Sequence, residues 1–205
     1  MAEPQSFVSD VAFSQSVKAE QTRHGSRAAY ARMEQGDGWE SELSPELSAF
    51  IAEQRSFFLA SANAKGQPYI QHRGGPPGFL HVLDLHTLAF ADFRGNRQYI
   101  TLGNLAENSQ VHLFLIDYAE RQRIKIWGNA RVVEDDPALL AKLTPADYKA
   151  RAERAIVIRV SAWDANCPQH IPRLFYEDDV ARVLAQKDAR IAELEAKLRG
   201  AMTQG

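Results

Sequence analysis

The sequence contains seven short runs of strand-forming residues, and most of the links between them are too short to hold a helix. Parallel strands need a crossover of about a dozen residues or more, usually helical, whereas antiparallel strands can be joined by tight turns. The pattern therefore predicts a mainly β domain, an antiparallel barrel rather than a parallel sheet. The runs are residues 56–63, 69–73, 80–85, 87–92, 111–118, 123–135 and 155–163.

Helices are predicted before the first strand and within the two longer links. In "SPELSAFIAEQ", Ser44 can cap a helix and Pro45 suits the first helical position, while the apolar residues fall on one face. The other two helices are expected near residues 97–107 and 137–143.

The two ends of the chain differ in composition from the strand-rich region. Residues 1–43 are polar, small and permissive for helix, so we expect an N-terminal helical arm that packs on the domain or on a second subunit. Residues 44–176 are predicted to form the β domain. Residues 177–205 are predicted to form a separate C-terminal helix.

This C-terminal segment has the apolar spacing of a coiled coil. Its apolar residues follow one another at intervals of four and three, and Lys187 interrupts the series. The pattern is consistent with pairing between two copies, with docking on the β domain, and with a solvated amphipathic helix. The apolar positions are Val180, Leu184, Ile191, Leu194 and Leu198.

Charge, hydropathy and cysteine content narrow the class of protein. The net charge of −2 provides no broad basic surface for sequence-independent DNA binding, so no nucleic-acid partner is expected. No apolar run approaches the ~20 residues that span a membrane, and the N-terminus lacks the plan of a secretory signal. Cys167 is the single cysteine, which excludes an internal disulfide and fits a reducing compartment. We therefore expect a cytoplasmic protein without a membrane partner.

The stretch "ADFRGNRQYITLGNLAEN" (residues 91–108) indicates an anion site. Asn96 can cap a helix that begins at Arg97, and a helix start offers unpaired N–H groups and partial positive charge. Arg97 would oppose that charge unless an anion lay there; the alternative is a surface arginine directed at water. Arg73 would add a second guanidinium group if its strand lies beside this turn, and arginine suits bidentate phosphate contacts.

Two further features fit either a ligand-binding or a purely structural role. The "GGPPG" segment (residues 74–78) lacks most Cβ atoms, so its backbone could lie against a flat ring, or it could be a rigid loop between strands. Gln122 begins a strand, and its amide both donates and accepts hydrogen bonds. It could therefore contact a ring edge rich in carbonyl and imide groups, or be an exposed strand end.

Cys167 and His170 do not predict a metal site or a catalytic pair. A structural zinc site needs four ligands, and the chain has no second cysteine and no histidines at ligand spacing. A nucleophile and base would need an oxyanion-stabilising group and a third partner, which cannot be recognised here. The segment 162–172 is therefore interpreted as a packed loop beside a ligand pocket.

Three segments in order resemble the pyridoxamine 5′-phosphate oxidase-like flavoproteins. They are "FFLASANAKGQPYIQHRGG", "LAFADFRGNRQYITLGNLAENSQVHLFLIDY" and "RQRIKIWGNARVVE", and the likeness covers residues 45–163. The chain is most similar to the flavin-nucleotide-binding branch that carries "RGGPPGF", "GNR" and "NCPQHIP".

The resemblance implies a six-stranded antiparallel split β-barrel of the FMN-binding type that forms a homodimer. One FMN would lie in each of two clefts between the subunits, with Gln122 contributed by the partner. The cofactor contacts implied by position are Gln71, His72, Arg73, Phe90, Ala91, Asn96, Arg97 and Gln122.

The resemblance also implies an FMN-dependent oxidoreductase, in which the flavin accepts a hydride at N5. His72 and His170 are the candidates for proton transfer, because histidine titrates near neutral pH. Three redox partners stay open: a nicotinamide nucleotide such as NAD(P)H, a small organic substrate, and oxygen. Two alternatives stay open: a non-catalytic flavin-binding or flavin-sensing protein, and a split barrel that binds haem or a deazaflavin.

Two departures from the family pattern argue against oxidation of pyridoxamine phosphate itself. Gln98 stands where the oxidases have the lysine of an Arg-Lys pair. The C-terminal segment with tryptophan and arginine is replaced by "WDANCPQHIP".

Overall fold

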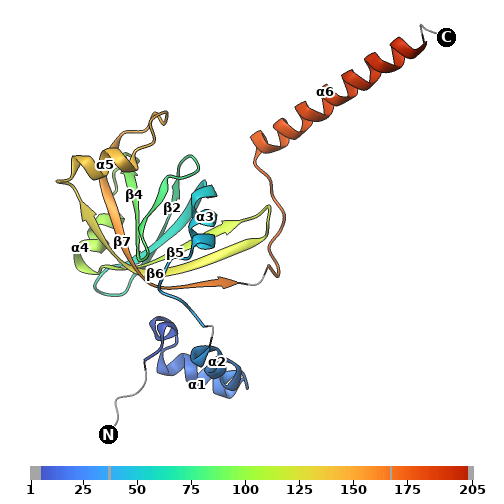
Figure 1. Cartoon of the computed structure of the whole chain (residues 1–205). Helices are drawn as coiled ribbons and strands as arrows, with labels where there is room; N and C mark the ends of the chain where they lie inside the picture. The colour runs from blue at the N-terminus through green and yellow to red at the C-terminus, as the bar shows by residue number, and fades with distance from the viewer. Residues whose placement is uncertain (1–5, 37, 167, 203–205) are drawn as a thin grey trace. The chain divides into compact units, whose positions relative to one another are not determined.

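Seven strands form one antiparallel sheet at the centre of the β domain (Figure 1). The structure is a computed structural model that describes residues 6–36, 38–166 and 168–202. The hydrogen-bonded order of the strands is β2-β1-β5-β6-β7-β4-β3. The strands are β1 (Ser56–Ala62), β2 (Pro68–Gly74), β3 (Leu80–Asp84), β4 (Thr87–Phe93), β5 (Gln110–Asp117), β6 (Gln122–Val133) and β7 (Ala152–Asn166).

Each of the seven sequence runs corresponds to one of these strands, and the prediction of a mainly β, antiparallel domain is confirmed. The count of six strands implied by the resemblance is not confirmed, because the sheet has seven. Its order runs from β2 at one edge to β3 at the other, and the pairings described include none that joins these edges into a closed barrel.

Alternation along β5 places the main core on one face of the sheet there, whereas β4 is buried on both faces because a second cluster, which includes Ala89 and Leu143, packs on its other side. In β5, Val111, Leu113 and Leu115 are buried while the residues between them are partly exposed. A period of two is expected for strands that cover a core on one side. Phe57 and Phe90 meet edge to face with their ring centroids 5.2 Å apart, and both side chains are about fully buried.

Helices precede the first strand, occupy the two longer links between strands and follow the last strand. Helix α3 begins as predicted: the Ser44 side chain accepts a hydrogen bond from the Leu47 N–H, and Pro45 is the first helical residue. The helical elements are η1 (Val8–Val11), α1 (Gln15–Arg23), α2 (Arg27–Gln35), α3 (Pro45–Glu53), α4 (Ile100–Glu107), α5 (Pro137–Leu143) and α6 (Glu177–Met202).

The N-terminal arm packs on the sheet through aromatic side chains. Phe13 contacts Tyr30 and Trp39, with ring centroids 5.3 Å and 5.1 Å apart. Trp39 in turn stacks on Trp127 of β6, with centroids 4.5 Å apart and an interplanar angle of 20°. Of the two partners expected for the arm, the structure therefore shows the chain's own β domain.

The chain divides into two compact units, Met1–Ile116 with Gln122–Cys167, and Asp117–Arg121 with Pro168–Gly205. The first unit contains the arm and the sheet, and the second contains α6. The predicted boundaries at residues 43 and 176 stay a prediction. No helix among the described residues is long and apolar enough to cross a membrane.

At Gly75, the loop that contains "GGPPG" packs against a side chain of the core. A Cβ atom at this position would lie 2.6 Å from Cγ of Phe79, a buried side chain that stacks on Phe57 with centroids 5.6 Å apart. Gly78 has φ of 83°, a left-handed conformation that glycine adopts without strain. The structural interpretation of the segment therefore holds at these two glycines.

The substitution Gly75→Ala is expected to lower the free energy of unfolding by about 1–3 kcal/mol, because the new methyl group overpacks the Phe79 ring. Urea denaturation followed by circular dichroism measures the change. Gly103→Ala is the control, since its methyl group would meet no atom within 4 Å and it lies inside α4. Equal stabilities of the two variants would contradict the assignment.

Candidate functional site

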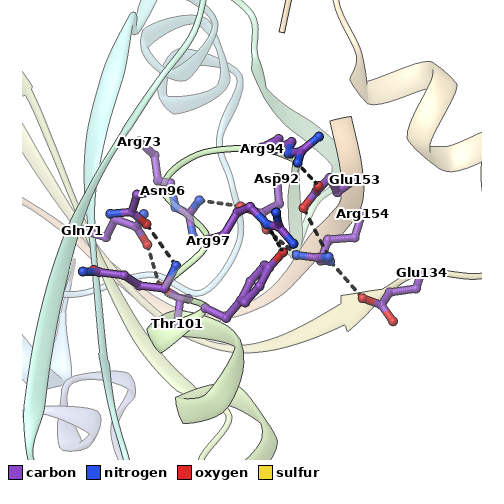
Figure 2. A network of polar contacts seen from close by, with 12 residues as sticks. Gln71, Arg73, Asp92, Arg94, Asn96, Arg97, Thr101, Glu134, Glu153 and Arg154 are labelled. Carbon is purple, nitrogen blue, oxygen red and sulfur yellow. Dashed lines mark hydrogen bonds and ion pairs between the residues drawn. The ribbon is translucent and has the colours of Figure 1, made fainter. Parts of the chain in front are cut away.

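Residues from three separate parts of the sequence line one cleft. Strand β2 contributes Tyr69, Gln71 and Arg73, and β7 contributes Glu153 and Arg154. The rest of the lining comes from the end of β4, the loop after it and the first turn of α4. Of the predicted cofactor contacts, the structure brings together Gln71, Arg73, Asn96 and Arg97 in this cleft (Figure 2).

The alternation of β2 separates His72 from the cleft. Gln71 and Arg73 line the cleft, so His72 between them points to the opposite face, as successive strand residues do. There its ring lies 5.6 Å from the ring of Phe58 and is exposed. His72 therefore does not line the cleft of its own chain, and its contact with the cofactor stays a prediction.

Arg73 is held in place by an ion pair with Asp92 of β4. Its Nη1 donates to Oδ1 of Asp92 at 2.5 Å, and its guanidinium carbon lies 5.5 Å from the centroid of Phe90. The side chain is only 12% exposed. Its Nε is buried and has no hydrogen-bond partner among the described residues. One face of the guanidinium group is therefore fixed while a buried donor is left unsatisfied.

Asp92 also binds Arg154, so one carboxylate joins two guanidinium groups (Figure 2). These two residues are cross-strand partners of β4 and β7, and Oδ2 of Asp92 lies 3.3 Å from Nη1 of Arg154. Arg154 also donates from Nε to Glu134 at 2.9 Å. Burial alone would lower the pKa of Arg154, but the charges of Asp92 and Glu134 raise it.

The helix after β4 begins later than predicted. Asn96 does not cap a helix at Arg97, because Arg97 and Tyr99 both have left-handed backbone, with φ of 63° and 56°, and α4 begins at Ile100. Instead, Oδ1 of Asn96 accepts from the N–H of Gln98 at 3.1 Å in a local turn. Arg97 therefore stands before the helix, and the predicted conflict with the helix dipole does not arise.

Arg97 is directed toward the same loop. Its Nε donates to the hydroxyl of Tyr99 at 3.4 Å, and this hydrogen bond raises the pKa of Arg97. The side chain is exposed, so its guanidinium group can reorient toward a ligand.

The first turn of α4 presents backbone donors to the cleft. The first helical hydrogen bond runs from the N–H of Gly103 to the carbonyl of Tyr99, and no side chain caps the helix. The first N–H groups of an α-helix have no intrahelical partner, and here no side chain caps them. Because such groups carry partial positive charge, they favour a bound anion.

A hydrogen bond ties this helix to β2. The hydroxyl of Thr101 donates to Oε1 of Gln71 at 2.8 Å, and the side chain of Gln71 keeps two amide donors available. Three arginines in the cleft face two carboxylates, those of Asp92 and Glu153. With the unpaired N–H groups, this arrangement suits an oxyanion such as a phosphate. The described residues include no cluster of three or more His, Cys, Asp or Glu that could hold a metal ion.

Phe90, Ala91 and Gln122 are not among the residues that line this cleft. Phe90 and Ala91 are 1% and 3% exposed and belong to the core, so they do not line it. Gln122 is exposed at the first residue of β6. His170 is exposed, has φ of 63° and belongs to the second unit. Cys167 lies outside the described residues.

Two residues that organise the site, Asp92 and Arg154, were not predicted from the sequence. Asp92 carried a signal, because it is a charged residue at the end of the otherwise apolar run "TLAFAD". Arg154 carried none, since only the register of β4 against β7 places it opposite Asp92.

Comparison with known proteins identifies the family. A family model described as pyridoxamine 5′-phosphate oxidase matches residues 43–187. No curated protein matches the chain. Among solved structures, HupZ from Group A Streptococcus has a TM-score of 0.50 at 16% identity and covers 64% of this chain and 98% of its own.

Two other solved structures are more distant. An FMN-binding protein from Syntrophomonas wolfei has a TM-score of 0.46 at 10% identity, covering 71% of this chain and 97% of its own. HutZ, the heme storage protein of Vibrio cholerae, has a TM-score of 0.37 at 18% identity, and the match covers 58% of this chain and 89% of its own. The likeness to HupZ shows a shared fold, and the family model covers more than half of the sequence. The chain therefore belongs to the pyridoxamine 5′-phosphate oxidase family.

Proposed function

We propose that the protein is an FMN-dependent oxidoreductase whose cleft binds the phosphate of FMN. The observation that carries the proposal is the convergence of Arg73 and Arg97 beside the uncapped first turn of α4. The buried Nε of Arg73 supports a ligand in particular, because an unsatisfied buried donor is unfavourable until it meets an acceptor. A phosphate ester has enough oxygens to accept from both guanidinium groups and from the backbone.

The roles of the chain's own residues follow from their contacts. Asp92 fixes Arg73 so that its free donors are oriented before the ligand arrives, which reduces the ordering needed on binding. Thr101 fixes the oxygen of Gln71, so the amide nitrogen of Gln71 is the group left to donate. When bound, FMN supplies the hydride and electron transfer, and the protein supplies binding and orientation.

A second copy of the chain is part of the proposal. The face of β1 and β2 opposite the cleft exposes Ile70 and Phe58, which are 64% and 37% exposed. A partner subunit that covered this apolar surface would remove it from water. His72 lies on the same face, so His72 and Gln122 stay predicted contacts to flavin shared between subunits.

Membership of the family does not determine the redox substrate. Gln98 at the cleft cannot supply the second cation of the Arg-Lys pair of the oxidases. We therefore propose a substrate other than pyridoxamine phosphate and leave its class open, with NAD(P)H as the first donor to test.

The absorption spectrum of freshly purified protein tests the proposal. We expect the bands of a flavin, release of FMN on denaturation, about one FMN per chain, and bleaching by a nicotinamide or another donor under anaerobic conditions. A yellow protein that no donor bleaches would indicate a binding or sensing role. A Soret band would indicate haem, a deazaflavin spectrum would indicate that cofactor, and colourless protein that takes up no added FMN would overturn the cofactor assignment.

A further inference from the structure

Helix α6 carries an apolar stripe along its length, and none of its described residues is buried. In heptad notation, Leu184, Ile191 and Leu198 take position a, and Val180 and Leu194 take position d. These five side chains are 43–63% exposed. A seam of this spacing is normally buried against another helix, because coiled-coil knobs insert into the holes of a partner.

The charges beside the seam determine which partner and orientation fit. The charged residues at position g are Arg190 and Lys197, both cations, and those at position e are Asp188 and Glu195, both anions. In a parallel pair, g of one helix faces e of the other. Arg190 would therefore face Glu195 of the second copy, and by symmetry this attractive pair occurs twice.

An antiparallel pair brings g against g and e against e. Every charged pair would then be cation against cation or anion against anion, whichever register the apolar residues adopt. Like charges at these positions disfavour pairing, and e and g charges set orientation in coiled coils. Within its own helix, Arg190 contacts Glu193 at 2.6 Å, an exposed pair of a kind that is weak and can be shared.

We propose that α6 forms a parallel, in-register, two-stranded coiled coil with α6 of a second copy of this chain. Lys187 then faces its counterpart at position d. A polar residue at a single seam position specifies register and strand number at the expense of stability. The proposal does not depend on flavin, so it can fail while the cofactor assignment stands, and the reverse.

Single cysteines in the full-length chain test the orientation, after replacement of the native cysteine by Cys167→Ser. Val180→Cys and Ala201→Cys place a thiol at position d near each end of the helix. In the parallel pair each variant alone is expected to form a disulfide-linked dimer on mild oxidation. Ala196→Cys, at the outer position f, is the matched control and is expected to react at least about tenfold more slowly, because Cα atoms more than ~7 Å apart cannot be bridged.

The outcomes are distinct. Rapid linkage of both d-position variants, with little linkage of the control, supports the proposal. Linkage only when Val180→Cys and Ala201→Cys chains are mixed after unfolding indicates an antiparallel pair and overturns it. Equal rates at all three positions indicate unpaired helices and also overturn it.

Lys187→Leu gives a second, independent measurement. Removal of the facing lysines is expected to raise the midpoint temperature at which the non-covalent α6 pair dissociates. It is also expected to increase the rate at which the Ala201→Cys protein forms its disulfide-linked dimer. Gln186→Leu, one residue earlier and outside the seam, is expected to change neither. If Lys187→Leu has the same effect as Gln186→Leu, or lowers the midpoint, position 187 is not in a parallel seam.

Discussion

FMN is expected to bind the double variant Arg73→Ala/Arg97→Ala about 3–6 kcal/mol more weakly than the unmodified protein, because each arginine supplies charge-assisted hydrogen bonds of ~1.5–3 kcal/mol. Titration of FMN into protein freed of cofactor, followed by the fluorescence of the flavin, measures the difference in binding free energy. Arg94→Ala is the matched control. Arg94 directly follows β4, as the loop with Arg97 does, but it contacts Glu153 at 3.8 Å and does not line the cleft.

The single variants separate binding from folding. Arg97 is exposed, so Arg97→Ala is expected to weaken binding without changing stability. Arg73→Ala also removes a partner of Asp92, so its stability must be measured beside its affinity. An affinity of the double variant equal to that of Arg94→Ala, in folded protein, would remove the phosphate assignment.

Asp92→Ala is expected to lower the free energy of unfolding by about 3–5 kcal/mol, because it leaves two nearly buried guanidinium groups without their shared carboxylate. Arg73 and Arg154 are 12% and 13% exposed. Chemical denaturation of the two proteins measures the change in free energy.

Glu134→Ala is the control for this second prediction. Glu134 binds the same Arg154 at 2.9 Å but is 62% exposed, so its loss is expected to cost less than about 1 kcal/mol. Similar decreases in the free energy of unfolding for the two variants would show that the burial of Asp92 does not determine how much its ion pairs stabilise the protein.

Local patterns in the sequence were sufficient to predict the strands and two of the helices within the β domain. The period of two in β5 and the capping sequence at Ser44 each involve only neighbouring residues. The alternation of β2 is equally local, because two adjacent strand residues, such as His72 and Arg73, point to opposite faces.

The errors arose where backbone conformation or distant pairing decides the structure. Arginine and tyrosine rarely adopt left-handed backbone, so nothing in "GNRQY" indicated that Arg97 and Tyr99 would delay the helix. The pairing of Asp92 with Arg154 depends on the register between two strands whose paired residues are 62 positions apart in the sequence. Such contacts follow from the whole sheet and leave no local pattern.

The position of β2 at the edge of the sheet has a consequence for solubility. Edge strands can recruit foreign polypeptide through their unpaired backbone groups, which leads to aggregation. Here Pro68 begins the strand and Pro76 and Pro77 follow it, and proline offers no N–H to an incoming chain. Edge-to-edge association is thereby discouraged at the strand that lines the proposed phosphate-binding cleft.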